Sequence, residues 1–372
     1  LPRPGPTGQV QLGYAHLLLG ETELAQLALA EAINLKPRDS KYRTLMAQLL
    51  LSLGSFQESI QQAETAAKLN PKNIRAAIIV SQAEIGAKHF ERAIKILSNL
   101  RNFIPDNEEI LGNLAIAYLG NNDPDTAKSL LKRILELAPG NSKAVTLLAK
   151  IEYRDNPAGA QALIQEQIKK APDSIGLYII LGNLFASIGH DEEALAAFQK
   201  ASQINPKDIN AILAAGRQLI RMGQKDKALA LYQSLMWTEP DSITGYMGAA
   251  AIQESNGKHA QAIENYKKVL ALAPGHPSAA NNLAWLTANE PNGDIGEALR
   301  LAMIAKQAAP GEPHIADTLG WVHYKRGSYS LAIPQFEMAL RSLPEDPIIT
   351  YHLALALKEN DQGEKAKEIL ES

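Results

Sequence analysis

Ten prolines recur along this chain at nearly constant spacing, and no other feature limits its fold so strongly. Seven of the nine intervals between them are 34 residues, and the other two are 33 and 36. Such regularity predicts a chain built from similar units, so a length of 372 residues need not mean two or three separate globular domains. The prolines are Pro37, Pro71, Pro105, Pro139, Pro172, Pro206, Pro240, Pro274, Pro310 and Pro344.

Small residues keep the same register as the prolines. Because small side chains let two helix backbones approach closely, two such positions in each unit predict a helical hairpin in which they face each other. The position twelve residues before each proline, with one further member, holds Ala25, Ser59, Ala93, Ala127, Ala160, Ala194, Ala228, Ala262, Ala298, Ala332 and Ala366. The eighth position of each unit holds Gly13, Ala47, Ser81, Ala115, Ala149, Gly182, Gly216, Ala250, Ala284, Gly320 and Ala354.

Between these two small positions the sequence predicts a tight turn. A residue with positive φ can end the first helix there, and glycine is found in seven units, as Gly20, Gly54, Gly189, Gly223, Gly257, Gly293 and Gly327. The proline cannot continue the second helix and therefore sets its end. Leucines just before the eighth position are expected to fill the space between adjacent units, as Leu12, Leu114, Leu148, Leu181, Leu283, Leu319 and Leu353.

This pattern resembles the tetratricopeptide repeat, in which Leu-Gly comes early, Ala stands at position twenty, a bulky residue at twenty-four and Pro at thirty-two. The resemblance covers residues 6–372. It implies an all-α fold, a right-handed superhelical solenoid of tandem antiparallel helix hairpins with one concave and one convex face. The bulky position is Leu or Ala in several units and aromatic in four, as Phe198, Tyr232, Tyr266 and Phe336.

The register divides the chain into a leader, ten full repeats and a partial eleventh. Residues 1–5 are expected to be an irregular leader cut from a longer protein, and 347–372 a partial repeat or C-terminal cap. Two repeats differ in length, and both changes are expected in the turn inside the hairpin. Pro334 lies within an expected second helix and predicts a kink or a late helix start. The ten repeats are 6–39, 40–73, 74–107, 108–141, 142–174, 175–208, 209–242, 243–276, 277–312 and 313–346.

Composition narrows the function. Lys and Arg number 37 against 40 Asp and Glu, which lacks the positive excess expected of a nucleic-acid-binding protein. There is no cysteine, so disulfides and thiolate sites are excluded while the redox compartment stays open. No run of eighteen apolar residues occurs, so the chain is not expected to span a membrane.

The sequence contains no catalytic motif that we recognise: no phosphate-binding loop, no nucleophile elbow and no His-Glu-x-x-His helix. Among eight scattered histidines, His314 and His352 are the two that neighbouring first helices could bring together. We therefore expect no enzyme activity, no metal and no cofactor. The expected ligand is a protein or a peptide.

In the family that the chain resembles, ligands lie in the concave groove along positions two, five, nine and twelve of the first helices. In the N-terminal half these positions are mixed, namely Thr44, Gln48, Arg75, Ile78, Gln82, Ile116, Lys143 and Lys150. In the C-terminal half they are rich in aromatic residues, namely Asn281, Trp285, Asp317, Trp321, Tyr324 and Tyr351.

This second set is the predicted partner site. The aromatic residues are expected to supply apolar contact, and Asn281 and Asp317 to orient the partner. Asp317 is expected to favour a partner that carries Lys, Arg or a free amine. The alternative is that Trp285 and Trp321 pack between hairpins and take no part in binding.

Three segments of the C-terminal repeats, 281–286, 317–322 and 351–354, also resemble bacterial tetratricopeptide lipoproteins linked to exopolysaccharide export and PEP-CTERM sorting systems. That resemblance implies a non-catalytic scaffold in an export assembly, periplasmic or membrane-anchored through other parts of a parent protein. The alternative is a cytoplasmic regulatory module of a larger enzyme such as a glycosyltransferase. The sequence leaves the oligomeric state open.

Overall fold

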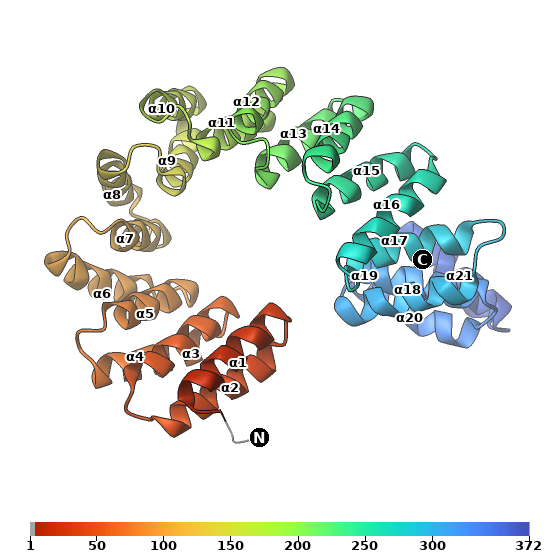
Figure 1. The fold of residues 1–372 in the computed structure, drawn as a ribbon, viewed down its shortest axis with the longest axis horizontal. Helices are drawn as coiled ribbons and strands as arrows, with labels where there is room; N and C mark the ends of the chain where they lie inside the picture. The colour runs from red at the N-terminus through yellow and green to blue at the C-terminus, as the bar shows by residue number, and fades with distance from the viewer. Residues whose placement is uncertain (1–3, 372) are drawn as a thin grey trace. The chain divides into compact units, whose positions relative to one another are not determined.

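The computed structural model describes residues 4–371, and in that range it contains twenty-two α-helices and no β-strand. Helices follow one another as antiparallel pairs along the chain (Figure 1). The all-α repeat fold expected from the sequence is confirmed. Contacts group the chain into two compact parts, residues 1–181 and 182–372, which we call the N-terminal body and the C-terminal body.

The N-terminal body contains five hairpins and the beginning of a sixth first helix. Its helices are α1 (Pro6–Leu18), α2 (Thr22–Leu35), α3 (Ser40–Ser52), α4 (Phe56–Leu69), α5 (Ile74–Gly86), α6 (Phe90–Phe103), α7 (Glu108–Gly120), α8 (Pro124–Leu137), α9 (Ser142–Asp155), α10 (Pro157–Lys170) and the first part of α11 (Ile175–Ser187).

The C-terminal body begins within α11 and ends with a short last helix. Its further helices are α12 (Asp191–Ile204), α13 (Ile209–Arg221), α14 (Lys225–Thr238), α15 (Ile243–Ser255), α16 (His259–Leu272), α17 (Pro277–Asn289), α18 (Ile295–Ala308), α19 (Pro313–Lys325), α20 (Tyr329–Ser342), α21 (Pro347–Glu359) and α22 (Gly363–Glu371).

Each helix pair falls within one expected repeat, and the two repeats of unusual length differ where the sequence places the change. Asn156 alone separates α9 from α10, and its side chain accepts a hydrogen bond from the Gly159 backbone N–H at 2.9 Å, which caps α10. Five residues, 290–294, separate α17 from α18. Residues 1–3 of the expected leader lie outside the described range, and 4–5 precede α1 without helical structure.

The small residues lie buried between the paired helices. All eleven residues of the series that begins with Ala25 are buried. In the second repeat the Ser59 hydroxyl donates a 2.7 Å hydrogen bond to the Ala47 carbonyl, so the two small positions are in direct contact. In three repeats glycine at the eighth position makes room for an aromatic ring; a Cβ on Gly216, for example, would lie 2.2 Å from the Tyr232 hydroxyl.

The turn between paired helices needs a residue with positive φ in most repeats. Gly20 has φ +77°, and in three repeats without glycine there the same position is held by Lys88, Asn122 and Asp361, also with positive φ. The expectation was wrong for Gly293, which does not have positive φ. Glycine is needed at position 293 because there is no room for a side chain: a Cβ there would lie 1.8 Å from the Thr287 carbonyl oxygen.

Six of the seven leucines expected between repeats are buried, and Leu12 in α1 is the exception with 42% exposure. In the described range no preceding hairpin covers α1, which explains the difference. Of the two outcomes expected at Pro334, the late helix start does not occur, because α20 begins at Tyr329 with Pro334 inside it, and the kink stays a prediction. Proline removes the hydrogen bond of its own nitrogen and its ring crowds the carbonyl four residues before it, while buried Ala332 and Phe336 hold the helix in the hairpin.

Candidate partner-binding surface

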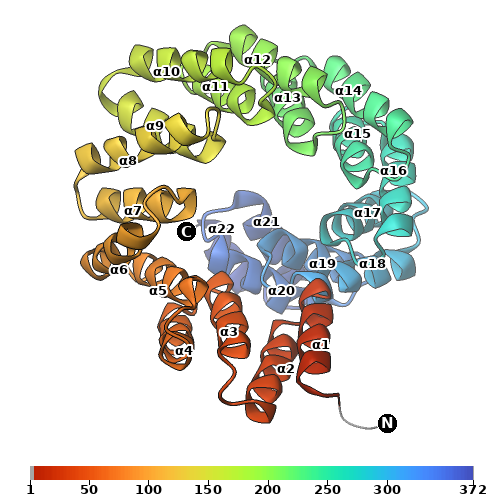
Figure 2. The same cartoon turned by 60° about the vertical axis from the view of Figure 1, so that its left-hand side comes forward.

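Three neighbouring first helices of the C-terminal body carry the six residues predicted as the partner site. Helix α17 provides Asn281 and Trp285, α19 provides Asp317, Trp321 and Tyr324, and α21 provides Tyr351. Helix α19 contacts both α17 and α21 (Figures 1 and 2). The repeat therefore brings residues from a span of seventy positions onto adjacent helices.

The aromatic side chains form a continuous row across these helices. The ring centroids of Trp285 and Trp321 are 5.8 Å apart, and Tyr324 stacks on Trp321 at 5.1 Å. Both tryptophans are partly buried against the hydrophobic core, and Tyr351 is 53% exposed. The tryptophans thus pack between hairpins and keep part of their surface accessible. The row resembles a rigid apolar contact surface of the kind that dominates protein interfaces.

The centre of the row is His352 on α21, for which the sequence suggested only a possible approach to His314. Its ring is buried and lies 4.4 Å from that of Trp321, 5.9 Å from Trp285 and 5.7 Å from Phe336. His352 follows Tyr351 directly, at the sixth position of its repeat. Its role depends on three other helices, so no local sequence signal identifies it.

Asp317 does not have the role that the sequence suggested. Its carboxylate is buried, and Oδ1 lies 2.8 Å from Nδ1 of His352. A carboxylate that is desolvated and already paired offers little to a cation of a partner, so the expected preference for Lys, Arg or a free amine does not follow from Asp317. The residue instead holds α21 against α19.

Amide side chains orient the rest of the surface. Trp321 donates from Nε1 to Oδ1 of Asn289 at 3.0 Å, and Asn289 donates in turn to the Trp285 carbonyl at 2.9 Å. Asn281 donates to Oδ1 of Asn282 at 3.2 Å, while its own Oδ1 is buried and has no hydrogen-bond partner. A buried acceptor without a donor carries a desolvation cost inside the fold, and the expected role of Asn281 in orienting a partner stays a prediction.

A buried phenol lies beneath this surface. Tyr266 donates to Oε2 of Glu254 at 2.8 Å and accepts from Nδ2 of Asn282 at 3.0 Å. Burial is the main cause that raises the pKa of Tyr266; the Asn282 hydrogen bond opposes the rise and Glu254 adds to it. The network therefore fixes Asn282, the neighbour of Asn281, from below.

The charges beside the aromatic row are of both signs. The Lys325 ammonium lies 6.0 Å from the centre of the Trp321 ring, a distance that allows a cation–π contact. Partial burial is the main cause that raises the pKa of Tyr324, and Glu359 adds to the effect. The surface is thus apolar with a mixed rim and does not select strongly for charge.

The equivalent face of the N-terminal body is polar and largely paired with itself. Arg75 donates to Gln48 at 2.5 Å and to Glu109 at 2.7 Å, and Glu109 also accepts from Gln82 at 3.2 Å. Ile78, expected on this face, is buried instead because it faces the core of its repeat. A cavity of about 440 Å³ lies beside this network, lined by residues of α5, α7, α8 and α9.

Within the described residues, no group of three or more His, Asp or Glu side chains is placed to hold a metal ion. The same residues include no helix long and apolar enough to cross a bilayer.

Comparison with known families identifies the repeat. Three family models, each described as tetratricopeptide repeat, match this chain. One matches residues 10–74, 213–277 and 318–370, the second matches residues 104–151, and the third matches residues 175–208. Together they cover well over half of the chain. This chain belongs to the tetratricopeptide-repeat family. Tetratricopeptide-repeat proteins bind protein partners, so the aromatic row lies in a protein-interaction scaffold.

Individual relatives are distant. BBSome complex member BBS4 of Bos taurus is 21% identical over 197 residues, which cover 53% of this tetratricopeptide-repeat chain and 38% of the relative. Lipopolysaccharide assembly protein B of Haemophilus influenzae is 23% identical over 184 residues, 43% of this chain and 46% of the relative. The chain thus spans less than half the length of either protein.

Among solved structures, yeast Tom70 aligns with a TM-score of 0.52 and 16% identity over 98% of this chain and 89% of its own. At that identity the similarity concerns the tetratricopeptide-repeat fold alone.

Proposed function

We propose that this tetratricopeptide-repeat chain is a non-catalytic scaffold that binds a partner protein through the first-helix face of residues 277–358. The observation that carries the proposal is the row of partly exposed aromatic rings from Trp285 through Trp321 to Tyr324. Rigid aromatic side chains give a large contact area at a small entropy cost, and they are enriched among residues that dominate binding energy.

The chemistry of this face favours an extended segment with apolar side chains. Tyr351 and the exposed parts of both tryptophans would contact those side chains. Because Asp317 is paired with His352, a cationic partner has no special advantage. An apolar segment of low net charge fits the surface best.

The test is the double substitution of Trp285 and Trp321 by alanine. Partners are first captured with the intact chain and identified by cross-linking and mass spectrometry. The double variant should then bind the cross-linked partner at least ~2 kcal/mol more weakly, about thirtyfold in Kd. Tyr14, which is 52% exposed in the N-terminal body, provides a matched control as Tyr14→Ala.

Circular dichroism separates the two explanations for weak binding. A double variant that keeps the helical signal and loses the partner supports the proposed site. Unchanged binding by the folded variant places the site elsewhere, and loss of the helical signal shows that the tryptophans serve mainly to hold the fold.

We further propose that the scaffold works in a bacterial export assembly, periplasmic or membrane-anchored through a parent protein. The resemblance of the C-terminal repeats to exopolysaccharide and PEP-CTERM lipoproteins supports this setting, as does the distant similarity to lipopolysaccharide assembly protein B. The alternative is a cytoplasmic regulatory module of an enzyme such as a glycosyltransferase. Fractionation of cells that produce the parent protein distinguishes the two, because recovery with the soluble cytoplasm would contradict an export role.

A further inference from the structure

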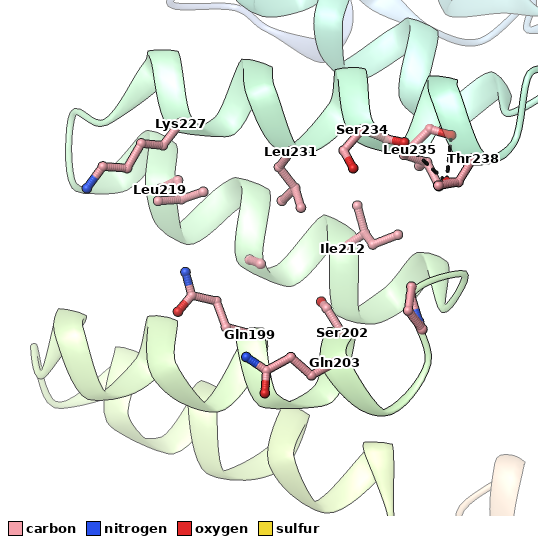
Figure 3. Close-up of a pocket in the computed structure, with 12 residues that line it drawn as sticks. Gln199, Ser202, Gln203, Ile212, Leu219, Lys227, Leu231, Ser234, Leu235 and Thr238 are labelled. Carbon is pink, nitrogen blue, oxygen red and sulfur yellow. Dashed lines mark hydrogen bonds between the residues drawn. The ribbon is translucent and has the colours of Figure 1, made fainter.

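The second helix of each hairpin lies on the side away from the first-helix face. On this second-helix side, the C-terminal body has a large hollow, formed by residues that precede the aromatic row in the sequence. It has a volume of about 590 Å³ and lies between α12 and α14, with α13 beneath them (Figure 3). In Figure 3, Gln199 and Gln203 come from the α12 side and Leu231 and Ser234 from the α14 side. Two second helices thus form the walls of a groove that runs along their length.

The groove has an apolar floor and neutral polar walls. Ile212 and Leu219 of α13 and Leu231 of α14 lie at its base, and amide and hydroxyl side chains stand at its edges. From Lys227 to Thr238 the α14 wall measures about 17 Å at 1.5 Å per residue, or three helical turns. These dimensions suit an amphipathic helix laid into the groove, the arrangement in which apolar residues repeat every three or four positions.

A tryptophan on the same helix exposes the largest side chain available to a partner. Trp237 is 87% exposed in the last turn of α14. The equivalent position holds Gln203 in the preceding repeat, Ala271 in the next one and Arg341 in the repeat 313–346. An indole exposed to this extent, at a position that polar or small residues fill in other repeats, adds little to the packing of its hairpin, and exposed tryptophans are frequent at interface centres.

The position of Trp237 on its helix places it beside two hollows. Ser234 and Thr238 line the first, while Gln233 and Met236 line a second hollow of about 510 Å³ next to α16. At 100° per residue, Trp237 projects between these two stripes of α14. Its ring therefore stands at the edge of the groove, where it can contact a bound ligand and still leave the groove open.

The charge of Lys227 indicates which end of a bound partner helix would lie next to it. Lys227 is the one charged residue among the described lining of the first hollow, and no ion pair of its ammonium is present in the described range. No carboxylate lines that hollow. A partner with an acidic residue at the end nearest Lys227 would add a favourable contact, and one with a basic residue there would be disfavoured.

We propose that the groove between α12 and α14 is a second docking surface, which binds an amphipathic helix of a protein partner that carries an acidic residue near Lys227. This site is separate from the first-helix face and does not depend on it.

The experiment uses the full chain and a displayed library of helical peptides of about fourteen residues, with apolar positions varied at helical spacing. Selected peptides should repeat apolar residues every three or four positions and carry Asp or Glu at one end. Their affinity, measured by fluorescence anisotropy, should fall at least about tenfold for Trp237→Ala and for Leu231→Gln. Lys227→Glu should weaken acidic peptides and leave their Gln-substituted versions unaffected.

Controls separate this site from the first-helix face and from self-association. The Trp285→Ala, Trp321→Ala double variant, checked to keep its helical signal, should bind the selected peptides as the parent does, whether or not it still binds the partner of the first-helix face. The proposal is overturned if no selected peptide depends on Leu231 and Trp237. It is also overturned if the chain alone forms dimers that Trp237→Ala dissociates, because a second copy would then occupy the groove.

Discussion

Nδ1 of His352 lies 2.8 Å from Oδ1 of Asp317, and this contact joins α21 to α19 inside a shell of aromatic rings. Both side chains are almost fully buried. The pair thus links the partial last repeat to the one before it, and it supports Trp321 from below. We therefore expect the geometry of the candidate surface to depend on His352, although His352 itself has little contact with solvent.

Replacing His352 by leucine should destabilise the C-terminal body by about 1–3 kcal/mol, because the Asp317 carboxylate would remain buried without its partner. Adding Asp317→Asn to that variant removes the charge and should recover part of the loss. Urea unfolding of the two single variants and the double variant measures the coupling. Additive losses would mean that the pair contributes no energy of its own.

The glycines opposite aromatic rings should not tolerate a methyl group. A Cβ on Gly320 would lie 2.7 Å from the ring of Phe336, which is fully buried, so Gly320→Ala should cost on the order of 1–3 kcal/mol. In the fourth repeat Ala115 faces Leu131 at the same two positions, and both are buried. Combining Gly320→Ala with Phe336→Leu should therefore cost less than the sum of the single changes in thermal or urea unfolding. A full sum would show that the two positions do not share space.

Enlarging a small residue between paired helices should also destabilise the array. Ala228 is fully buried in α14, and Ala228→Leu should overpack the hairpin by about 1–3 kcal/mol. Ala230, two residues away on the same helix, is exposed, and Ala230→Leu is the matched control that should change stability by less than about 0.5 kcal/mol. Equal thermal midpoints for both variants would contradict the assignment of the small positions.

Stability should decrease in alkali because of Tyr266. Its folded-state pKa is raised by burial above the ordinary value near 10, so the unfolded chain ionises first as the pH rises. The contribution of protonated Tyr266 to the free energy of unfolding is therefore fully present below about pH 10 and is lost as the pH rises further. Tyr266→Phe should reduce this alkaline loss in urea unfolding, whereas Tyr14→Phe, at an exposed position, should not. Parallel pH profiles for all three chains would show that Tyr266 does not titrate differently in the folded state.

The repeat register was readable from the sequence because close helix packing restricts side-chain size at fixed positions. Ala228 and Ser59 could be assigned from spacing alone, and the same register placed Trp285 and Trp321 on adjacent first helices. The restriction to small residues follows from local geometry that every repeat shares. One chain therefore contains many independent examples of the restriction.

Other features depended on contacts between repeats, which spacing does not describe. Asp317 was expected to meet a partner, but the fold places His352 against it and buries both. Gly293 was expected to adopt positive φ, but a longer connection instead brings it against the Thr287 carbonyl. The groove beside Trp237 is lined by residues of α12, α13 and α14, which belong to two repeats, so the pattern within one repeat does not describe it. The sequence by itself determined the family, the hairpins and the helices that carry the aromatic residues. Only the tertiary structure decided which of those residues are buried, paired or accessible, because burial is set by side chains that lie one or more repeats away.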